Sequence, residues 1–252
     1  MSELQGQIKD YKSNVIKRFD DESRWYSIEN RKLWRPSVTT VIGQTLNKGP
    51  GYDEWLGNHP SYKEACLTRD TAAAVGTIVH DSIETMLGGF PVDLEKCEHK
   101  NKVWKRMMSF MKWHELESPY NIVATELKLW HKDVAFSGTP DLIIEKDGVL
   151  RLIDYKTGAH YKSHELQCSM YKILWDKIFP DYPIEHIQGM YLKDTWISKV
   201  EPIVKTFKFC PEEVDACVKL WTWYKSTAKG KPYPKEKAQV DKVFSLRDEE
   251  NL

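Results

Sequence analysis

The stretch FSGTPDLIIEKDGVLRLIDYK, from Phe136 to Lys156, decides the fold of this chain. Its two halves are rich in branched apolar residues, and the Asp-Gly pair between them is a strong signal for a tight turn. The pattern predicts a β-hairpin with strands over 142–145 and 149–155. Pairing across this hairpin brings Asp141, before the first strand, beside Asp154, near the end of the second.

The end of this hairpin combines two carboxylates with an ammonium group. Side chains two apart on a strand share a face, so Asp154 and Lys156 point the same way and Tyr155 points the other. Divalent cations such as Mg²⁺ bind carboxylate oxygens, and a nearby lysine can orient a water or stabilise developing charge. This arrangement suits phosphodiester hydrolysis. Taken alone it also fits an ordinary solvated hairpin, because Asp and Lys are common at strand ends.

A helix over 72–87, ended by Gly88-Gly89, is indicated by apolar residues at helical spacing. His80 and Glu84 are four residues apart and share one face of it. A lone His beside an apolar stripe is more often a structural residue than a ligand, but the hairpin carboxylates favour the ligand. Glu126, in the apolar segment 122–130 predicted as a strand, is a third acidic candidate and equally a solvent-facing strand residue.

Gln167 and Tyr171 are also four apart, on a helix predicted over 163–179. An amide and a phenol on one helical face could hold the active-site lysine or contact a phosphate or base. Without the other motifs, exposed helix residues would be as good an interpretation.

Together the motifs resemble those of RecB-type nucleases in the PD-(D/E)xK superfamily. The residues that carry the resemblance are GTIVH at 76–80, Glu126, GTPD at 138–141, DYK at 154–156, Gln167 and Tyr171. The segment PSVTTVIGQT at 36–45 further resembles phage exonucleases and the mitochondrial genome maintenance exonucleases.

The resemblance implies an α/β fold with a restriction-endonuclease-like core, an α-β-β-β-α-β mixed sheet flanked by helices. It implies Mg²⁺ or Mn²⁺ as cofactor, with Lys156 as the catalytic lysine. The metal ligands it implies are His80, Asp141, Asp154 and the backbone carbonyl of Tyr155. Glu84 and Glu126 match less closely: we expect them to support the metal ligands or to bind a second metal, with Glu126 counted among the catalytic carboxylates and Glu84 among the candidate metal ligands. DNA contacts are expected from Gln167, Tyr171, Thr77 and Thr157.

An iron-sulfur cluster, which several RecB-type nucleases hold with four cysteines, is not expected here. The five cysteines include no Cys-x-x-Cys pair, and only Cys210 and Cys217 follow Tyr171. Four thiolates therefore do not occur in the pattern that such a cluster needs.

Composition sets the outer bounds. The chain has 252 residues, 41% of them hydrophobic, which suffices for one sizeable core. We expect a helical and loop segment over 1–70, packed on or arching over the core, with a Gly- and Pro-rich loop at 47–60. The nuclease core would span 71–228 and a charged tail 229–252. No long apolar run or secretory signal is evident, so we expect no membrane association and a cytoplasmic protein, in the host cytoplasm if phage-encoded.

The charge balance is even, with 37 Lys plus Arg and 37 Asp plus Glu. This counts against indiscriminate coating of duplex DNA but permits a local basic groove, for which Arg18 near the N-terminus and Lys105 and Arg106 on a predicted helix are candidates.

The sequence thus predicts a metal-dependent DNA exonuclease that prefers single-stranded or end-containing DNA. We expect it to act in replication, recombination or repair, where a recombination or replication protein could be its partner. Two alternatives stay open: a catalytically silent nuclease fold that binds DNA or a partner, and an endonuclease.

Overall fold

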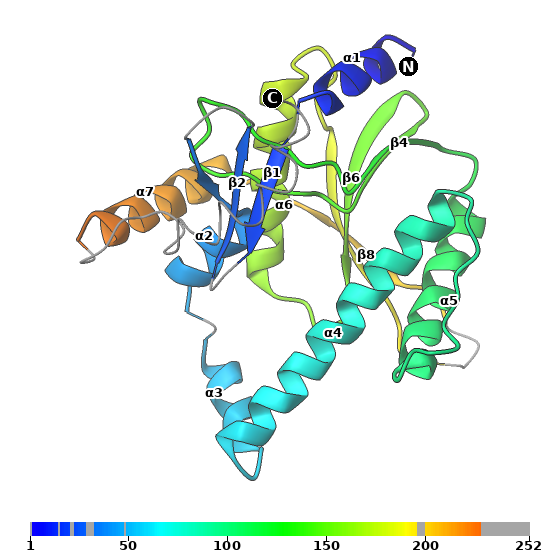
Figure 1. Ribbon diagram of the computed structural model, residues 1–252, viewed down its shortest axis with the longest axis vertical. Helices are drawn as coiled ribbons and strands as arrows, with labels where there is room; N and C mark the ends of the chain where they lie inside the picture. The colour runs from blue at the N-terminus through cyan, green and yellow to red at the C-terminus, as the bar shows by residue number, and fades with distance from the viewer. Residues whose placement is uncertain are drawn as a thin grey trace, which may run out of the picture.

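Figure 1 shows the computed structural model of the chain, in which residues 2–14, 16–20, 23–28, 33–47, 49–195 and 200–227 are described. Two sheets and seven helices make up this described part. The expected tail over 229–252 lies outside it. None of the described helices is long and apolar enough to span a membrane.

The larger sheet has five strands in the order β4-β5-β6-β7-β8. These are β4 (Asn121–Thr125), β5 (Leu142–Lys146), β6 (Val149–Lys156), β7 (His186–Tyr191) and β8 (Ile203–Phe207). β6 and β7 pair in parallel, joined by helix α6 (Lys162–Ile178), whereas the other neighbours are antiparallel. With α4 (Tyr62–Leu87) ahead of β4, the predicted α-β-β-β-α-β core is confirmed.

The β5–β6 hairpin forms as the sequence predicts. Leu142 pairs with Ile153, which leaves Asp141 and Asp154 as the next pair towards the open end. At the turn, Asp147 and Gly148 both have positive φ, 56° and 80°. Such a turn twists in the sense that the flanking strands need, and Gly adopts it without a steric penalty.

Helices cover both faces of this sheet, because the hairpin strands bury alternate residues on opposite sides. Leu142 and Ile144 pack with α4 and α5 (Lys100–Glu117), which lie side by side in Figure 1. Ile143 and Leu152 pack on the other face with residues of α6 and α7 (Pro211–Thr227). The sheet thus divides the core into two parts. The open end of the β5–β6 hairpin borders a cleft.

The N-terminal segment adds helix α1 (Ser2–Lys12) and a small antiparallel sheet. Its strands are β1 (Ile16–Asp20), β2 (Arg24–Ile28) and β3 (Arg35–Pro36). This sheet continues into the segment that leads to Asp141: the Ser137 N–H donates to the Pro36 carbonyl at 2.9 Å, and the Val38 N–H, at the start of α2 (Val38–Thr45), donates to the Ser137 carbonyl at 2.8 Å.

Two predicted boundaries in the first ninety residues were wrong. The expected loop at 47–60 contains a helix, α3 (Pro50–Gly57), and α4 begins at Tyr62 rather than at residue 72. Ser61 caps α4 by accepting a hydrogen bond from the Glu64 N–H at 3.2 Å. This first part of α4 is largely exposed and lacks an apolar stripe, so helical periodicity could not reveal it. In Figure 1, α3 and the start of α4 project from the sheets.

Candidate active site

A cleft of about 700 Å³ lies at the open end of the β5–β6 hairpin. The residues expected to act in catalysis, metal binding or DNA contact all line it: Thr77, His80, Glu84, Glu126, Asp141, Asp154, Tyr155, Lys156, Thr157, Gln167 and Tyr171. The first three come from α4, and the last two come from α6. The fold therefore gathers residues separated by almost a hundred positions into one site. The groove candidates Lys105 and Arg106 do not line the cleft and instead pair with Asp194.

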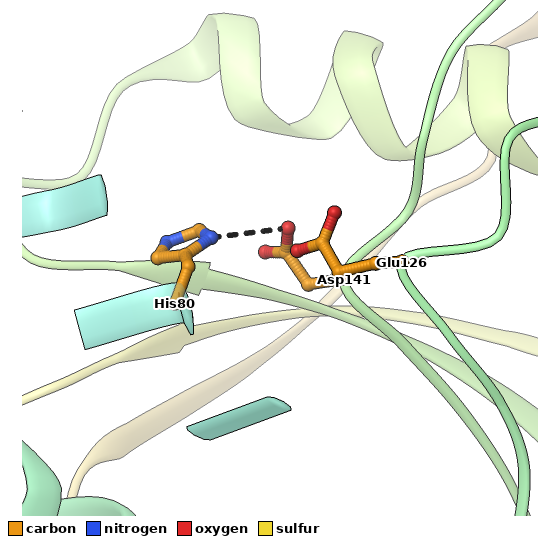
Figure 2. A group of neighbouring side chains, drawn as sticks. All are labelled: His80, Glu126 and Asp141. Atoms are coloured by element: carbon orange, nitrogen blue, oxygen red, sulfur yellow. Dashed lines mark ion pairs between the residues drawn. The ribbon is translucent and has the colours of Figure 1, made fainter. Parts of the chain in front are cut away.

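A candidate metal site lies within this cleft. Figure 2 shows His80, Glu126 and Asp141 converging, and one ligand atom from each lies within 4.8 Å of the others. His80 Nδ1 is 3.2 Å from Asp141 Oδ1. Among the described residues no other group of three acidic, His or Cys side chains meets this criterion.

Glu126 reaches this group by a turn that the sequence did not predict. The strand expected over 122–130 exists but is shorter than predicted, because β4 (Asn121–Thr125) ends before Glu126, which has a left-handed φ of 44°. Its N–H donates to the Asp141 carbonyl at 3.1 Å, which fixes the backbone of both acidic residues. A left-handed conformation is uncommon for Glu and is often found at functional sites.

The two hairpin carboxylates are held differently. Asp141 Oδ2 accepts a hydrogen bond of 2.6 Å from the Tyr155 N–H across the hairpin. Asp154 forms an ion pair with Lys156 through its Oδ2 and accepts from Gln167 Nε2 at 3.2 Å through its Oδ1. Asp141 therefore faces His80 and Glu126, whereas Asp154 orients the lysine.

Gln167 links the hairpin to α6. Its Oε1 accepts a hydrogen bond of 3.0 Å from Lys156 Nζ, and its Nε2 also lies 3.1 Å from the Tyr171 hydroxyl. An amide is suited to this position because it offers an acceptor and two donors at once. This hydrogen bond fits one of the roles that the sequence left open for Gln167, and its contact with DNA stays a prediction.

Gly138 of the GTPD motif is required by close packing. A Cβ built at this position would lie 2.4 Å from Tyr171 Cε1. Only a residue without a side chain allows the segment before Asp141 to approach the Tyr171 ring this closely. The motif glycine thus positions the α6 side of the cleft against the hairpin.

Burial and crowding shift the pKa values of the acidic groups. Burial, reinforced by the charge of Asp141, raises the pKa of Glu126 to about 8. Burial likewise raises the pKa of Asp154 to about 6, although Lys156 opposes the rise. Burial alone would lower the pKa of His80, but Asp141 outweighs it and raises that pKa to about 9. Such crowding of buried carboxylates is relieved by a bound cation.

Several residues that line the cleft were not assigned a role from the sequence, or were named there only as groove candidates. Arg18, a candidate for the basic groove, does line the cleft, together with Arg24 and Lys128. Both arginines bind one carboxylate: Arg18 Nη2 is 2.6 Å from Asp20 Oδ2, and Arg24 Nε is 3.0 Å from its Oδ1. Two guanidinium groups with one carboxylate leave a net positive charge on this wall.

Tyr161 and His164 also line the cleft, at the corner between β6 and α6. Neither was singled out from the sequence, because an aromatic residue and a histidine near a helix start carry no functional signal by themselves. The five cysteines are free thiols, and the absence of an iron-sulfur cluster stays a prediction.

Comparison with known proteins gives the family. A family model described as the PD-(D/E)XK nuclease superfamily matches residues 57–216. The chain therefore belongs to the PD-(D/E)XK nuclease superfamily. A search of curated proteins finds no significant match.

Solved structures similar to this chain include an alkaline exonuclease (LHK-Exo) from Laribacter hongkongensis, with 8% identity and a TM-score of 0.42 over 85% of this chain and 94% of that one. Another is SSO0001, with 15% identity and a TM-score of 0.39 over 97% of this chain and 92% of that one. Both likenesses are distant, and we draw nothing further from them.

Proposed function

We propose that this protein is a divalent-metal-dependent DNA exonuclease that prefers single-stranded or end-containing DNA and serves replication, recombination or repair. The observation that carries the proposal is the convergence of His80, Glu126 and Asp141 beside the Asp154–Lys156 pair in one cleft. Superfamily membership supports the hydrolysis of nucleic acid as the reaction.

The residues present fit a hard divalent cation. An imidazole nitrogen and two carboxylates are suitable ligands. Burial, followed by the charge of Asp141, raises the pKa of Glu126, and a cation beside it would favour the ionised carboxylate. We assign His80, Glu126 and Asp141 to Mg²⁺ or Mn²⁺, with Asp154 and the Tyr155 carbonyl beside them and Glu84 as a candidate ligand of a second ion. When bound, the cation would polarise the phosphate and make a water more acidic.

Lys156 acts in this proposal as a charged donor. Burial would lower its pKa, but Asp154 and Asp141 outweigh burial and raise it, so the ammonium stays protonated at neutral pH. A protonated lysine cannot accept a proton from water. It can orient the attacking water and stabilise negative charge that develops on the phosphate oxygens.

The alternatives differ in what the cleft would do. A silent nuclease fold would need neither the lysine nor the full set of acidic residues, yet the cleft has both, so catalysis is favoured. An endonuclease would use the same chemistry on DNA without ends. Cleavage of linear and circular substrates therefore distinguishes an exonuclease from an endonuclease.

A cleavage time course tests the proposal. End-labelled linear single-stranded DNA, linear duplex and circular single-stranded DNA are incubated with Mg²⁺, Mn²⁺ or EDTA. We expect metal-dependent loss of linear DNA, a spared circle, no cleavage by Lys156→Ala, and normal cleavage by Lys219→Ala, which alters an exposed lysine on α7. Cleavage of the circle would indicate an endonuclease. Absence of cleavage under every condition would favour the catalytically silent nuclease fold that binds DNA or a partner.

A further inference from the structure

One end of the cleft is aromatic. After Lys156 the chain runs through residues 157–161 into α6, and this corner places Tyr161 and His164 in the cleft. The two rings meet edge to face, with centroids 5.6 Å apart and planes at 89°. Tyr161 is 57% exposed, so its ring is accessible to a ligand in the cleft.

His164, which packs against Tyr161, is itself held by further rings. His164 packs on Tyr191 with centroids 5.8 Å apart, and its Nδ1 lies 2.9 Å from the Tyr191 hydroxyl. His160 packs against Tyr191 at 5.5 Å and against Phe207 of β8 at 6.0 Å. Because Tyr161 already packs against a ring that is held in place, a base that stacks on Tyr161 would need to order few further side chains.

The imidazole at this end of the cleft is also uncharged. Burial, helped by the nearby Lys156 charge, lowers the pKa of His164 to about 3, so its imidazole is neutral near pH 7. A neutral imidazole and a phenol attract a phosphate poorly, whereas both present flat faces that can stack on a base. The aromatic corner therefore offers a base flat faces on which to stack.

The cations that could bind the backbone line the same cleft from the N-terminal sheet and the segment after β4. They are Arg18, Arg24 and Lys128. Cations along the backbone path combined with exposed aromatic rings are typical of sites for single-stranded nucleic acid. Inside a duplex the faces of the bases are covered by their neighbours, so away from the ends only an unpaired base can stack on a side chain.

We propose that Tyr161, supported by His164, stacks on an unpaired base beside the reacting phosphate and so selects single-stranded DNA. This inference rests on the proposed function and names its substrate class. In the test, kcat and KM are measured on single-stranded and duplex DNA for Tyr161→Ala and Tyr161→Phe. Stacking predicts that Tyr161→Ala raises KM on single strands roughly 5- to 150-fold and changes duplex cleavage little, while Tyr161→Phe behaves as the parent.

Tyr224→Ala is the matched control, because Tyr224 is 50% exposed on α7 and does not line the cleft. A set of oligonucleotides, each with one abasic nucleotide at a different position, then locates the contact. At one position the abasic substrate and Tyr161→Ala should cause the same loss, and their combination no further loss. Additive losses at every position, an equal loss on duplex, or unchanged kinetics would each overturn the inference.

Equilibrium binding separates this inference from the proposed function. Fluorescent single-stranded and duplex oligonucleotides are titrated with the parent and Tyr161→Ala in EDTA, where no cleavage occurs. A parent that never cuts DNA but binds single strands through Tyr161 would refute the proposed function and leave the stacking contact standing. If the parent cuts DNA and Tyr161→Ala binds DNA as well as the parent does, the stacking contact would be refuted and the proposed function would stand.

Discussion

The two sheets contribute different chemistry to one cleft. The five-stranded sheet supplies Asp141 and Asp154, which are only 8% and 2% exposed, while the three-stranded sheet supplies Arg18 and Arg24, which are partly exposed. Acidic groups that bind a metal must be fixed before the substrate arrives, and burial among hydrogen bonds fixes them. Groups that bind a phosphate backbone can stay solvated. We therefore expect one sheet to perform the chemistry and the other to bind the substrate.

Asp141→Asn should give the largest effect. The substitution keeps the shape of the side chain but removes the charge that faces His80 and Glu126. We expect kcat to fall at least roughly 1,000-fold, with the affinity for single-stranded DNA in EDTA unchanged or higher. Single-turnover cleavage and equilibrium binding measure the two quantities.

Asp133→Asn serves as the control, because Asp133 is exposed and does not line the cleft. If Asp141→Asn weakened DNA binding as much as it slowed cleavage, the division of labour between the two sheets would be wrong.

The metal-free site should make the protein less stable as the pH rises. The pKa of His80 is raised from 6.5 to about 9, mainly by Asp141 acting against burial, so the stability it contributes is present below pH 6.5 and lost by pH 9. The pKa of Glu126 is raised from 4.5 to about 8 by burial and Asp141, so its contribution is lost between pH 4.5 and 8. Both groups therefore make the free energy of unfolding fall as the pH rises.

A divalent cation should reverse this trend, because binding requires both protons to leave and each released proton makes affinity rise about tenfold per pH unit. Thermal melts with EDTA and with Mn²⁺ between pH 6 and 9 measure both effects. We expect the Tm to fall with pH in EDTA and the gain from Mn²⁺ to grow with pH. Asp141 has a lowered pKa because His80 outweighs burial. Its contribution to stability therefore changes only at acidic pH, outside the range of these melts. A gain that is independent of pH would place the ion elsewhere.

Arg18→Ala should weaken DNA binding and leave the chemical step intact. If Arg18 contacts a phosphate, its removal raises KM on all sequences and reduces the slope of log affinity against log salt by roughly 1, while kcat stays within about twofold. Binding measured at several salt concentrations tests this. Arg69→Ala is the control, since Arg69 is an exposed arginine paired with Asp70 outside the cleft. A loss in kcat without a change in the salt slope would show that the smaller sheet acts on the chemistry.

The sequence predicts the five-stranded sheet better than the smaller one, and the reason is the range of the interactions. The hairpin is encoded locally, by alternating apolar residues and an Asp-Gly turn, so the pairing of its carboxylates follows from the sequence alone. The place of Arg24 depends on how the N-terminal sheet packs on a segment over a hundred residues later, where the Tyr26 hydroxyl lies 2.9 Å from Thr139 Oγ1. No local pattern records such a contact.

Glu126 and Tyr161 show two further limits. Glu126 was found as an acidic candidate, but its left-handed backbone, which ends β4 early, has no signature in a run of apolar residues. The proposed role of Tyr161 depends on His164 of α6, which packs against it and is itself held by Tyr191 of β7. Motifs indicate which residues carry out chemistry, whereas the residues that bind the substrate depend on tertiary packing.

The smallest effects are expected from two glycine substitutions, one beside the cleft and one in the β5–β6 turn, which compare packing at the cleft with backbone strain away from it. Gly138→Ala forces a methyl group against the Tyr171 ring and should cost about 1–3 kcal/mol of stability. Gly148→Ala strains the hairpin turn, where φ is 80°, and should cost about 1–2 kcal/mol. Denaturant unfolding measures both.

Only Gly138→Ala should also change catalysis, because Tyr171 contacts Gln167, which holds Lys156. At a temperature where both variants are fully folded, we expect Gly138→Ala to lower kcat several-fold and Gly148→Ala to match the parent. Equal kcat values for the two variants would mean that the Gln167–Tyr171 contact does not position the lysine. In that case the α6 side of the cleft would belong with the small sheet, as a surface that binds DNA without taking part in the reaction.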